Sequence, residues 1–170
     1  MIQLVNDLYR HMEWADAAVW AAVLNCDPAR NDSKLRETLY HIHMTQRAFL
    51  RTWLKEPRQP FPTFDELPTL LDWGRTFYSE AFSYLSTLNE DNLAEPLPVP
   101  WATMFERVMG RGAEVTTSGE TLLQAAFHSL YHRGQANARL RELGGEPPLV
   151  DYIAWIWMGK PSADWPGITS

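Results

Sequence analysis

The 170-residue sequence is poor in cysteine, in net positive charge and in long hydrophobic runs, and each shortage excludes a class of protein. Its one cysteine, Cys26, cannot form an internal disulfide. Fifteen Lys and Arg against twenty-one Asp and Glu give a net charge of -6, which leaves no basic field for nucleic acid or an anionic membrane surface. No apolar run approaches the roughly 18–20 residues that span a bilayer. We therefore expect a soluble protein without nucleic-acid or membrane partners.

The start of the chain also lacks the pattern of a secretory leader, because Asn6, Asp7 and Arg10 interrupt it early. Together with the single cysteine, this predicts a cytoplasmic protein. The length and a hydrophobic content of 45% are sufficient for one domain, residues 1–170, whose core needs neither disulfides nor metal for stability.

Apolar residues recur at three- and four-residue spacing in four long segments, which is typical of amphipathic helices. The predicted helices run from Ile2 to about Leu24, from Asp32 or Ser33 to about Glu56, from about Pro68 to Leu88, and from Thr117 to about Leu143. Thr117 and Glu120 have the spacing of a capping box at the start of the last long helix. A short fifth helix is expected around residues 151–158.

Proline clusters at residues 57–68, 96–100 and 147–148 interrupt these helices. The segment 96–117, around the tripeptide "GRG", has shorter patterns that indicate a β-hairpin or an irregular excursion outside the helices. The predicted fold class is all-α: a four-helix bundle with one long, partly β-hairpin-like connection before the last long helix.

The stretch "FHSLYHRGQ", residues 127–135, carries two histidines four residues apart. His128 and His132 differ by only about 40° around a helix, so both imidazoles leave the same face. The pair could bind a metal, do acid–base chemistry, or be two satisfied core histidines. The face forms a polar stripe of Gln124, His128, His132 and Gln135, with Leu123, Phe127, Leu130 and Ala138 beside it as expected apolar contacts.

A metal site needs at least one further ligand from another helix. His41 and His43 stand about 200° apart on the second helix, so they cannot share a face. His41 lies among the small residues Thr38, Thr45, Ala48 and Thr52, which would leave room for a cavity in the bundle. His43 shares its side with Arg36, Tyr40, Arg47 and Arg51, and we predict that it is an ordinary surface histidine. His41 is therefore the predicted third ligand.

Three other polar residues are candidates for contacts around this centre. His11, on the alanine-rich inner face of the first helix, either is a hydrogen-bonded core histidine or lines the same cavity. Gln46 and Gln135 are further candidates, Gln135 because it faces the histidine pair. The catalytic residues beyond these cannot be named from the sequence.

The two residues after His132 have structural interpretations. Arg133 is expected to make a structural salt bridge or to cap a carbonyl group rather than contact substrate. Gly134 costs roughly 1 kcal/mol relative to alanine inside a helix, and close packing against a neighbouring helix would offset that cost.

The segments "LYHIHMTQRAFL" and "FHSLYHRGQANARLRELGGEPPLVDYI" together resemble the DinB/YfiT-like superfamily over nearly the whole chain. The resemblance implies a helical bundle with a three-histidine site for a divalent metal at His41, His128 and His132. Many relatives have a glutamate where this chain has Gln46, so any role of that carboxylate is absent here. Parts of the superfamily are thiol-dependent transferases or isomerases that use bacillithiol, mycothiol or glutathione, and dimers are frequent.

Three neutral imidazoles suit Zn, Ni, Fe or Cu and do not choose among them. The predicted function is a metal-dependent enzyme, of transferase, isomerase or hydrolase type, that activates water or a low-molecular-weight thiol for a small-molecule substrate. The alternative is a non-catalytic, stress-related interaction protein in which the ion is structural. Trp155 and Trp157 cannot both face inward on one helix, and an outward tryptophan favours a homodimer.

Overall fold

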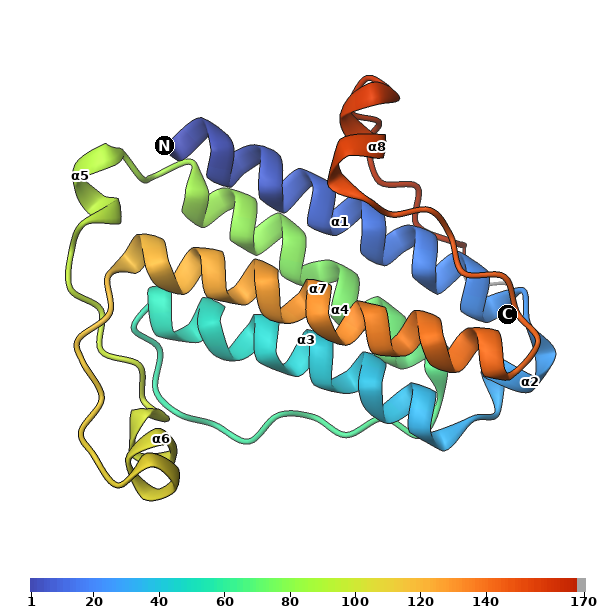
Figure 1. Cartoon of the computed structure of the whole chain (residues 1–170), viewed down its shortest axis with the longest axis horizontal. Coiled ribbons are helices and arrows are strands. Elements are labelled where there is room, and N and C mark those ends of the chain that lie inside the picture. Colours follow the sequence, from blue (N-terminus) through green and yellow to red (C-terminus); the bar gives the residue numbers. More distant parts are fainter. Residues whose placement is uncertain (168–170) are drawn as a thin grey trace.

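The computed structural model describes residues 1–167 of the chain. Four long helices lie side by side as a bundle: α1 (Ile2–Leu24), α3 (Ser33–Trp53), α4 (Leu67–Leu85) and α7 (Ser118–Glu142) (Figure 1). Four short helices complete the described part: α2 (Asp27–Arg30), α5 (Glu90–Leu93), α6 (Ala102–Met109) and α8 (Tyr152–Trp157). The predicted all-α four-helix bundle is confirmed. None of the described helices is both long and apolar enough to cross a membrane.

Each long helix packs against two neighbours, α1 and α3 both contacting α4 and α7. The colours of Figure 1 show that α3 and α4 run in one direction and α1 and α7 in the other. The connection 54–66 must therefore return along the whole bundle between α3 and α4. The sequence indicated one long connection, and this is a second one. Pro57, Pro60 and Pro62 favour the extended backbone that such a connection needs.

The other long connection, before α7, is hairpin-like only at its base. Pro96 and Thr117 form an isolated antiparallel bridge, and Leu97 N–H donates to the Thr116 carbonyl oxygen at 2.7 Å. Between these ends the chain forms α6, which stops at Gly110 in the left-handed conformation with φ 68°. The hairpin prediction was therefore wrong for the middle of the segment. Figure 1 shows α6 beside the bundle rather than in it, as the sequence indicated.

The starts of α3 and α7 follow the predicted caps. The Asp32 side chain accepts from Leu35 N–H at 2.7 Å. Thr117 and Glu120 form the capping box, in which each side chain accepts from the other residue's backbone N–H. The ends differ more, because α3 stops at Trp53 and α4 at Leu85, each three residues earlier than predicted.

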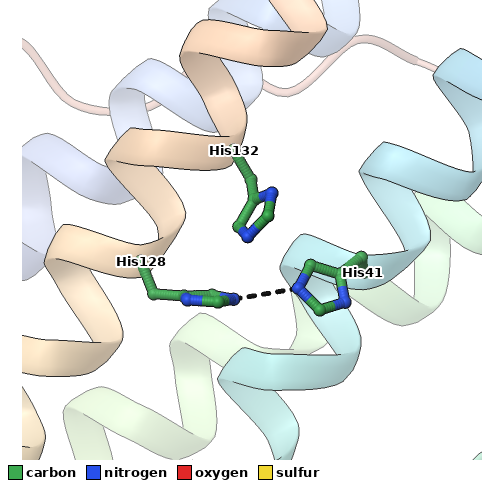
Figure 2. Close-up of side chains that lie close together, drawn as sticks. All are labelled: His41, His128 and His132. Atoms are coloured by element: carbon green, nitrogen blue, oxygen red, sulfur yellow. Dashed lines mark hydrogen bonds between the residues drawn. The ribbon is translucent and has the colours of Figure 1, made fainter.

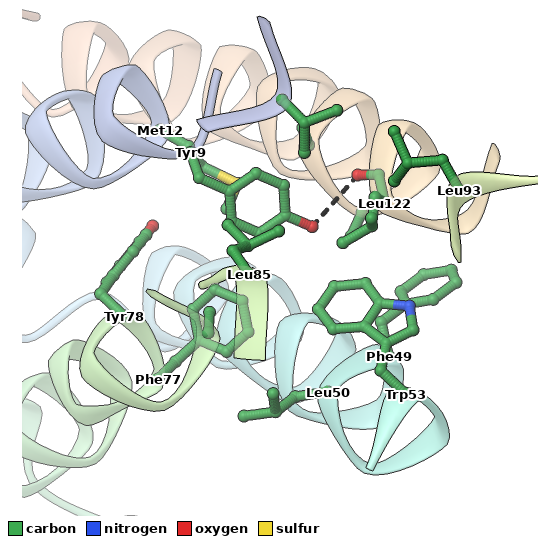
Figure 3. Packing of buried hydrophobic residues seen from close by; sticks show 14 residues of the cluster. Tyr9, Met12, Phe49, Leu50, Trp53, Phe77, Tyr78, Leu85, Leu93 and Leu122 are labelled. Atoms are coloured by element: carbon green, nitrogen blue, oxygen red, sulfur yellow. Dashed lines mark hydrogen bonds between the residues drawn. The ribbon is translucent and has the colours of Figure 1, made fainter. Parts of the chain in front are cut away.

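The core consists of two apolar clusters with a polar layer between them. One cluster, shown in Figure 3, fills the end of the bundle where α1 begins, and there the Tyr9 hydroxyl donates to the Leu122 carbonyl oxygen at 3.1 Å. The other fills the opposite end, around Trp20, Leu39 and Leu140. Between them, six buried side chains form what we call the polar layer: Asp16, His43, Gln46, Tyr78, Ser129 and Arg133. Every long helix contributes to this layer.

Candidate metal centre

Three histidines from two helices point toward one another on the α3–α7 contact (Figure 2). One ring nitrogen from each of His41, His128 and His132 lies within 4.8 Å of the corresponding nitrogens of the other two. The Nε2 atoms of His41 and His128 are 3.0 Å apart. All three side chains are half-buried. We call this group the histidine triad.

Buried contacts on the inner side of α7 fix the rotation of this helix about its own axis, and that rotation directs His128 and His132 toward α3. Ser129 and Arg133 each follow a triad histidine by one residue, and both are buried in the polar layer. Arg133 Nη1 donates to Asp16 Oδ1 at 2.6 Å, which ties this turn of α7 to α1. The structural salt bridge expected for Arg133 is confirmed. Because the inner side of α7 is held in this way, His128 and His132 can only face α3 and solvent.

Gln135 lies beside the triad and fixes one imidazole. His132 Nδ1 is 2.8 Å from the Gln135 side-chain oxygen Oε1. Since an amide oxygen only accepts, Nδ1 must carry the hydrogen and Nε2 keeps its lone pair. That lone pair is the one available on the triad side (Figure 2). Gln135 is thus placed to orient a ligand through its far nitrogen, as such partners do in metal sites.

The triad favours neutral imidazoles. Burial, followed by repulsion from His132 and His41, lowers the pKa of His128 to about 4. The pKa of His41 is also lowered, first by burial and then by His132. Three cations could not be held so close together. At neutral pH, His41 and His128 therefore carry no charge, which is the form that coordinates a metal.

The donor set fits a divalent transition-metal ion. Imidazole nitrogens bound at about 2.0–2.1 Å to one tetrahedral ion lie roughly 3.3 Å apart. The triad nitrogens, between 3.0 Å and 4.8 Å apart, need only small side-chain rotations to reach that spacing. Three ligands leave a coordination position open, and the half-exposed side of the triad gives a small molecule access to it.

His43 is not a surface residue, and that prediction was wrong. Its side chain is 1% exposed, with Trp20 Nε1–H donating to Nε2 at 2.8 Å and Nδ1–H donating to Gln46 Oε1 at 2.8 Å. Both ring nitrogens are therefore occupied by protein. Burial is also the main cause that lowers the pKa of His43.

The arginine-rich side of α3 faces the bundle because other segments cover it. Arg47 pairs with Glu80 of α4, and Arg36 donates to the Asp65 carbonyl oxygen in the connection 54–66. Gly74 on α4 makes room for the imidazole, since a Cβ there would lie 2.6 Å from the His43 ring. The neighbouring basic side chains therefore made a buried histidine look like a surface residue in the sequence. The one sequence feature that could have indicated its burial, Gly74, is 31 residues away.

Gln46 belongs to the polar layer. It is fully buried, and its Nε2 donates to Asp16 Oδ2 at 2.9 Å and to Ser129 Oγ at 3.2 Å. Tyr78 also donates to Asp16, and its pKa is raised well above the ordinary value by burial and then by that carboxylate. Asp16 and Tyr78 were not singled out in the sequence. The only sign of Asp16 was a carboxylate among the alanines of the inner face of α1.

His11 lies outside the triad. Its Nε2 is 2.9 Å from the Val150 carbonyl oxygen, and its ring packs edge-on against Tyr152 and Trp155. Burial is the largest cause that lowers the pKa of His11. The structure therefore places His11 where it joins α1 to the segment around α8, in the hydrogen-bonded arrangement that was one of its two interpretations.

Two further expectations about α7 were wrong. The polar stripe is not flanked by buried apolar contacts at Phe127 and Leu130, which are 54% and 52% exposed, and Gln124 and Gln135 of the stripe are exposed as well. The triad therefore lies at the surface of the bundle. Gly134 does not pack closely either, since a Cβ there would have nothing within 4 Å. The buried face of α7 is adjacent to the polar stripe and includes Ala126, Ser129 and Arg133.

The model of the DinB family matches residues 1–163, which include all four long helices and the triad. A search of the curated proteins found no match.

Proposed function

The chain belongs to the DinB family, and on that premise we propose that it is a metal-dependent enzyme that binds one divalent ion at His41, His128 and His132. The ion activates water or a low-molecular-weight thiol toward a small-molecule substrate, in a transfer, isomerisation or hydrolysis. The observation that carries the proposal is the convergence of three imidazole nitrogens, from two helices, within 4.8 Å of one another.

The chain's own residues have distinct roles in this proposal. The triad holds the ion, which when bound supplies a Lewis acid that lowers the pKa of a coordinated water or thiol. Gln135 keeps the hydrogen of His132 on Nδ1, so that Nε2 remains a ligand. The polar layer keeps α7 in one rotation through the Asp16–Arg133 pair.

A purely structural ion is the alternative, and two observations disfavour it. Structural zinc sites are closed by four protein ligands, whereas only three histidines converge among residues 1–167. The two helices are also joined without an ion, because Leu39 and Leu140 share one apolar cluster and Arg139 pairs with Asp32 at 2.6 Å. Because an ion is not needed to join α3 and α7, a catalytic role for it is favoured over a structural role.

We further propose a cytoplasmic homodimer. Exposed apolar side chains support the dimer: Tyr131 on α7 is 65% exposed and Trp157 on α8 is 78% exposed, whereas Trp155 is buried. Light scattering of the purified protein tests the proposed dimer directly, and a monomer at micromolar concentration would contradict that oligomeric state.

Elemental analysis of untagged protein, purified without added metal, tests the proposal. We expect roughly one divalent ion per chain, as one three-ligand site requires, and its loss in the double variant His128→Ala/His132→Ala. Gln124→Ala, an exposed change one turn before His128 on the same helix, is the matched control and should keep the ion. The loaded and chelated forms are then compared for consumption of cellular thiols with electrophiles and for ester hydrolysis. A bound ion with no turnover in either screen would favour the structural alternative.

A further inference from the structure

A cavity lies at the C-terminal end of α3, and none of the triad histidines lines it. Its volume is about 740 Å³, and it lies between the last turns of α3, the proline-rich connection 54–66 and residues 96–101. Trp101, Phe61 and five prolines contribute to its lining. Cavities of roughly 300–1,000 Å³ with mostly apolar walls and a few polar groups are typical of small-molecule sites.

The cavity continues the face of α3 that carries His41. Ala48 and Thr52, which line it, differ from His41 by only about 20° around the helix, and Ala48 lies about 10 Å further along the axis. This is the row of small residues in which the sequence indicated room for a cavity. The cavity is therefore beside the triad on the same helix but is formed by different residues.

The charge of the lining is opposite to that of the chain. Arg51, Lys55 and Arg58 line the cavity against one carboxylate, Glu56, in a protein of net charge -6. The two arginines are held by the walls: Arg51 lies 4.2 Å over the Phe61 ring, and Arg58 donates to the Pro100 carbonyl oxygen at 3.3 Å. Lys55 makes neither a hydrogen bond nor an ion pair through its side chain to any residue in the range 1–167. Its ammonium group is free for a ligand.

Lys55 also occupies a backbone position that favours glycine. It follows the last turn of α3 with φ 55°, and the bonds Lys55 N–H to Thr52 and Glu56 N–H to Arg51 form a Schellman turn. Glycine is the usual residue at that position because a side chain in the left-handed region is strained. A lysine at this strained position, at the rim of a cavity, points to a role for its side chain.

We propose that this cavity binds a small organic anion with an apolar or aromatic body, whose charged group is held by Lys55. The apolar body packs against Trp101, Phe61 and the prolines. Arg51 and Arg58 add positive potential while holding the walls together. The site does not depend on an ion at the triad.

Equilibrium dialysis of chelated, metal-free full-length protein tests this with two anions, 2-naphthoate and decanoate, each paired with the neutral alcohol of the same skeleton. We expect saturable one-to-one binding of at least one anion and weaker binding of its alcohol. Lys55→Gly should weaken anion binding by about two- to fivefold, the range for one exposed charge contact, and leave alcohol binding unchanged. Relief of the left-handed strain should raise the unfolding midpoint by about 2–4 °C, so weaker binding could not be attributed to misfolding.

Two further variants complete the design. Lys34→Ala makes the same change in net charge at an exposed position near the other end of α3, and it should not alter binding. Ala48→Trp should fill the cavity and abolish binding of both the anion and the alcohol. Absence of saturable anion binding to the unmodified protein, or equal weakening by Lys55→Gly and Lys34→Ala, would overturn the proposal. Because all binding measurements are made without metal, their outcome does not depend on whether the proposed metal-dependent function is correct.

Discussion

The bundle places two sets of polar side chains next to each other: the half-exposed histidine triad between α3 and α7, and the polar layer directly behind it. Both draw on the same stretches of helix. His41 and His43 are two residues apart on α3, and Ser129 and Arg133 each follow a triad histidine on α7. In the polar layer both nitrogens of His43 are bonded to protein, whereas each triad histidine directs a nitrogen at its neighbours.

The difference shows what makes a histidine available for chemistry. Burial alone does not, because His43 is more deeply buried than His41. What matters is whether the protein itself satisfies the lone pair. We therefore expect changes in the polar layer to reduce stability and changes in the triad to reduce metal binding, and the following predictions test that separation.

The largest effect is expected at Asp16. Asp16→Asn would leave the buried guanidinium of Arg133 without its counter-charge, since the two side chains are only 4% and 2% exposed. Breaking one partner of a buried ion pair typically costs about 3–5 kcal/mol of the free energy of unfolding. Urea denaturation of the metal-free protein measures this. The control Asp27→Asn removes a surface pair with Arg30 and should change stability by less than about 1 kcal/mol. Similar losses in both variants would show that the layer is not the stabilising element we infer.

The second prediction sets the two histidines of α3 against each other. His41→Ala should abolish measurable metal binding, because loss of a group that merely orients a ligand already costs about 10–100-fold in affinity. It should leave the stability of the metal-free protein nearly unchanged. His43→Ala should do the reverse: it leaves the Trp20 indole N–H and the Gln46 side-chain oxygen without partners and creates a cavity, at a cost of about 2–4 kcal/mol. Metal titration by calorimetry below the unfolding temperature, with denaturation curves, separates the two.

The outcome for His43→Ala decides whether the faces of α3 are assigned correctly. Loss of the ion in that variant while its helix content is intact would place the metal on the inner side of α3. Retention of the ion in His41→Ala would do the same.

The third prediction concerns acid. Coordination needs a neutral imidazole, so protons compete with the metal only as pH falls through the pKa of a ligand. Because burial and the neighbouring histidines lower the pKa of His128 to about 4, and the pKa of His41 is also lowered, loading at a limiting metal concentration should stay constant down to about pH 6.5, the ordinary value for histidine. It should then decline as the pH approaches 4. Loading that stays unchanged from pH 6.5 down to about 4.5 would indicate carboxylate ligands instead, because carboxylates are still ionised in that range.

The sequence allowed the three converging histidines to be predicted but not their surroundings. Helical spacing is local, so it placed His128 and His132 on one face and separated His41 from His43 correctly. Which face of a helix is covered by its neighbours depends on segments that are distant in the sequence. His43 is buried because Gly74 of α4 and the connection 54–66 cover it, and neither is near His43 in the sequence. The same limit applies to Asp16, whose partner Arg133 is 117 residues away.

The smallest change in stability is expected for two glycines, of which one lies at the surface, like the triad, and the other is packed in the interior, like the polar layer. Gly134 lies on the exposed side of α7, where an added Cβ would meet nothing within 4 Å, so Gly134→Ala should raise the free energy of unfolding by about 0.5–1 kcal/mol through helix propensity alone. Gly74 is also within a helix and has the same propensity to gain, but a Cβ there would meet the His43 ring at 2.6 Å. Gly74→Ala should therefore destabilise the protein, by about 1–3 kcal/mol as in other overpacked cores. Metal affinity should be unchanged in Gly134→Ala. If both glycines gave the same gain in urea denaturation, His43 would not be packed against α4, and the boundary between the polar layer and the surface would have to be redrawn.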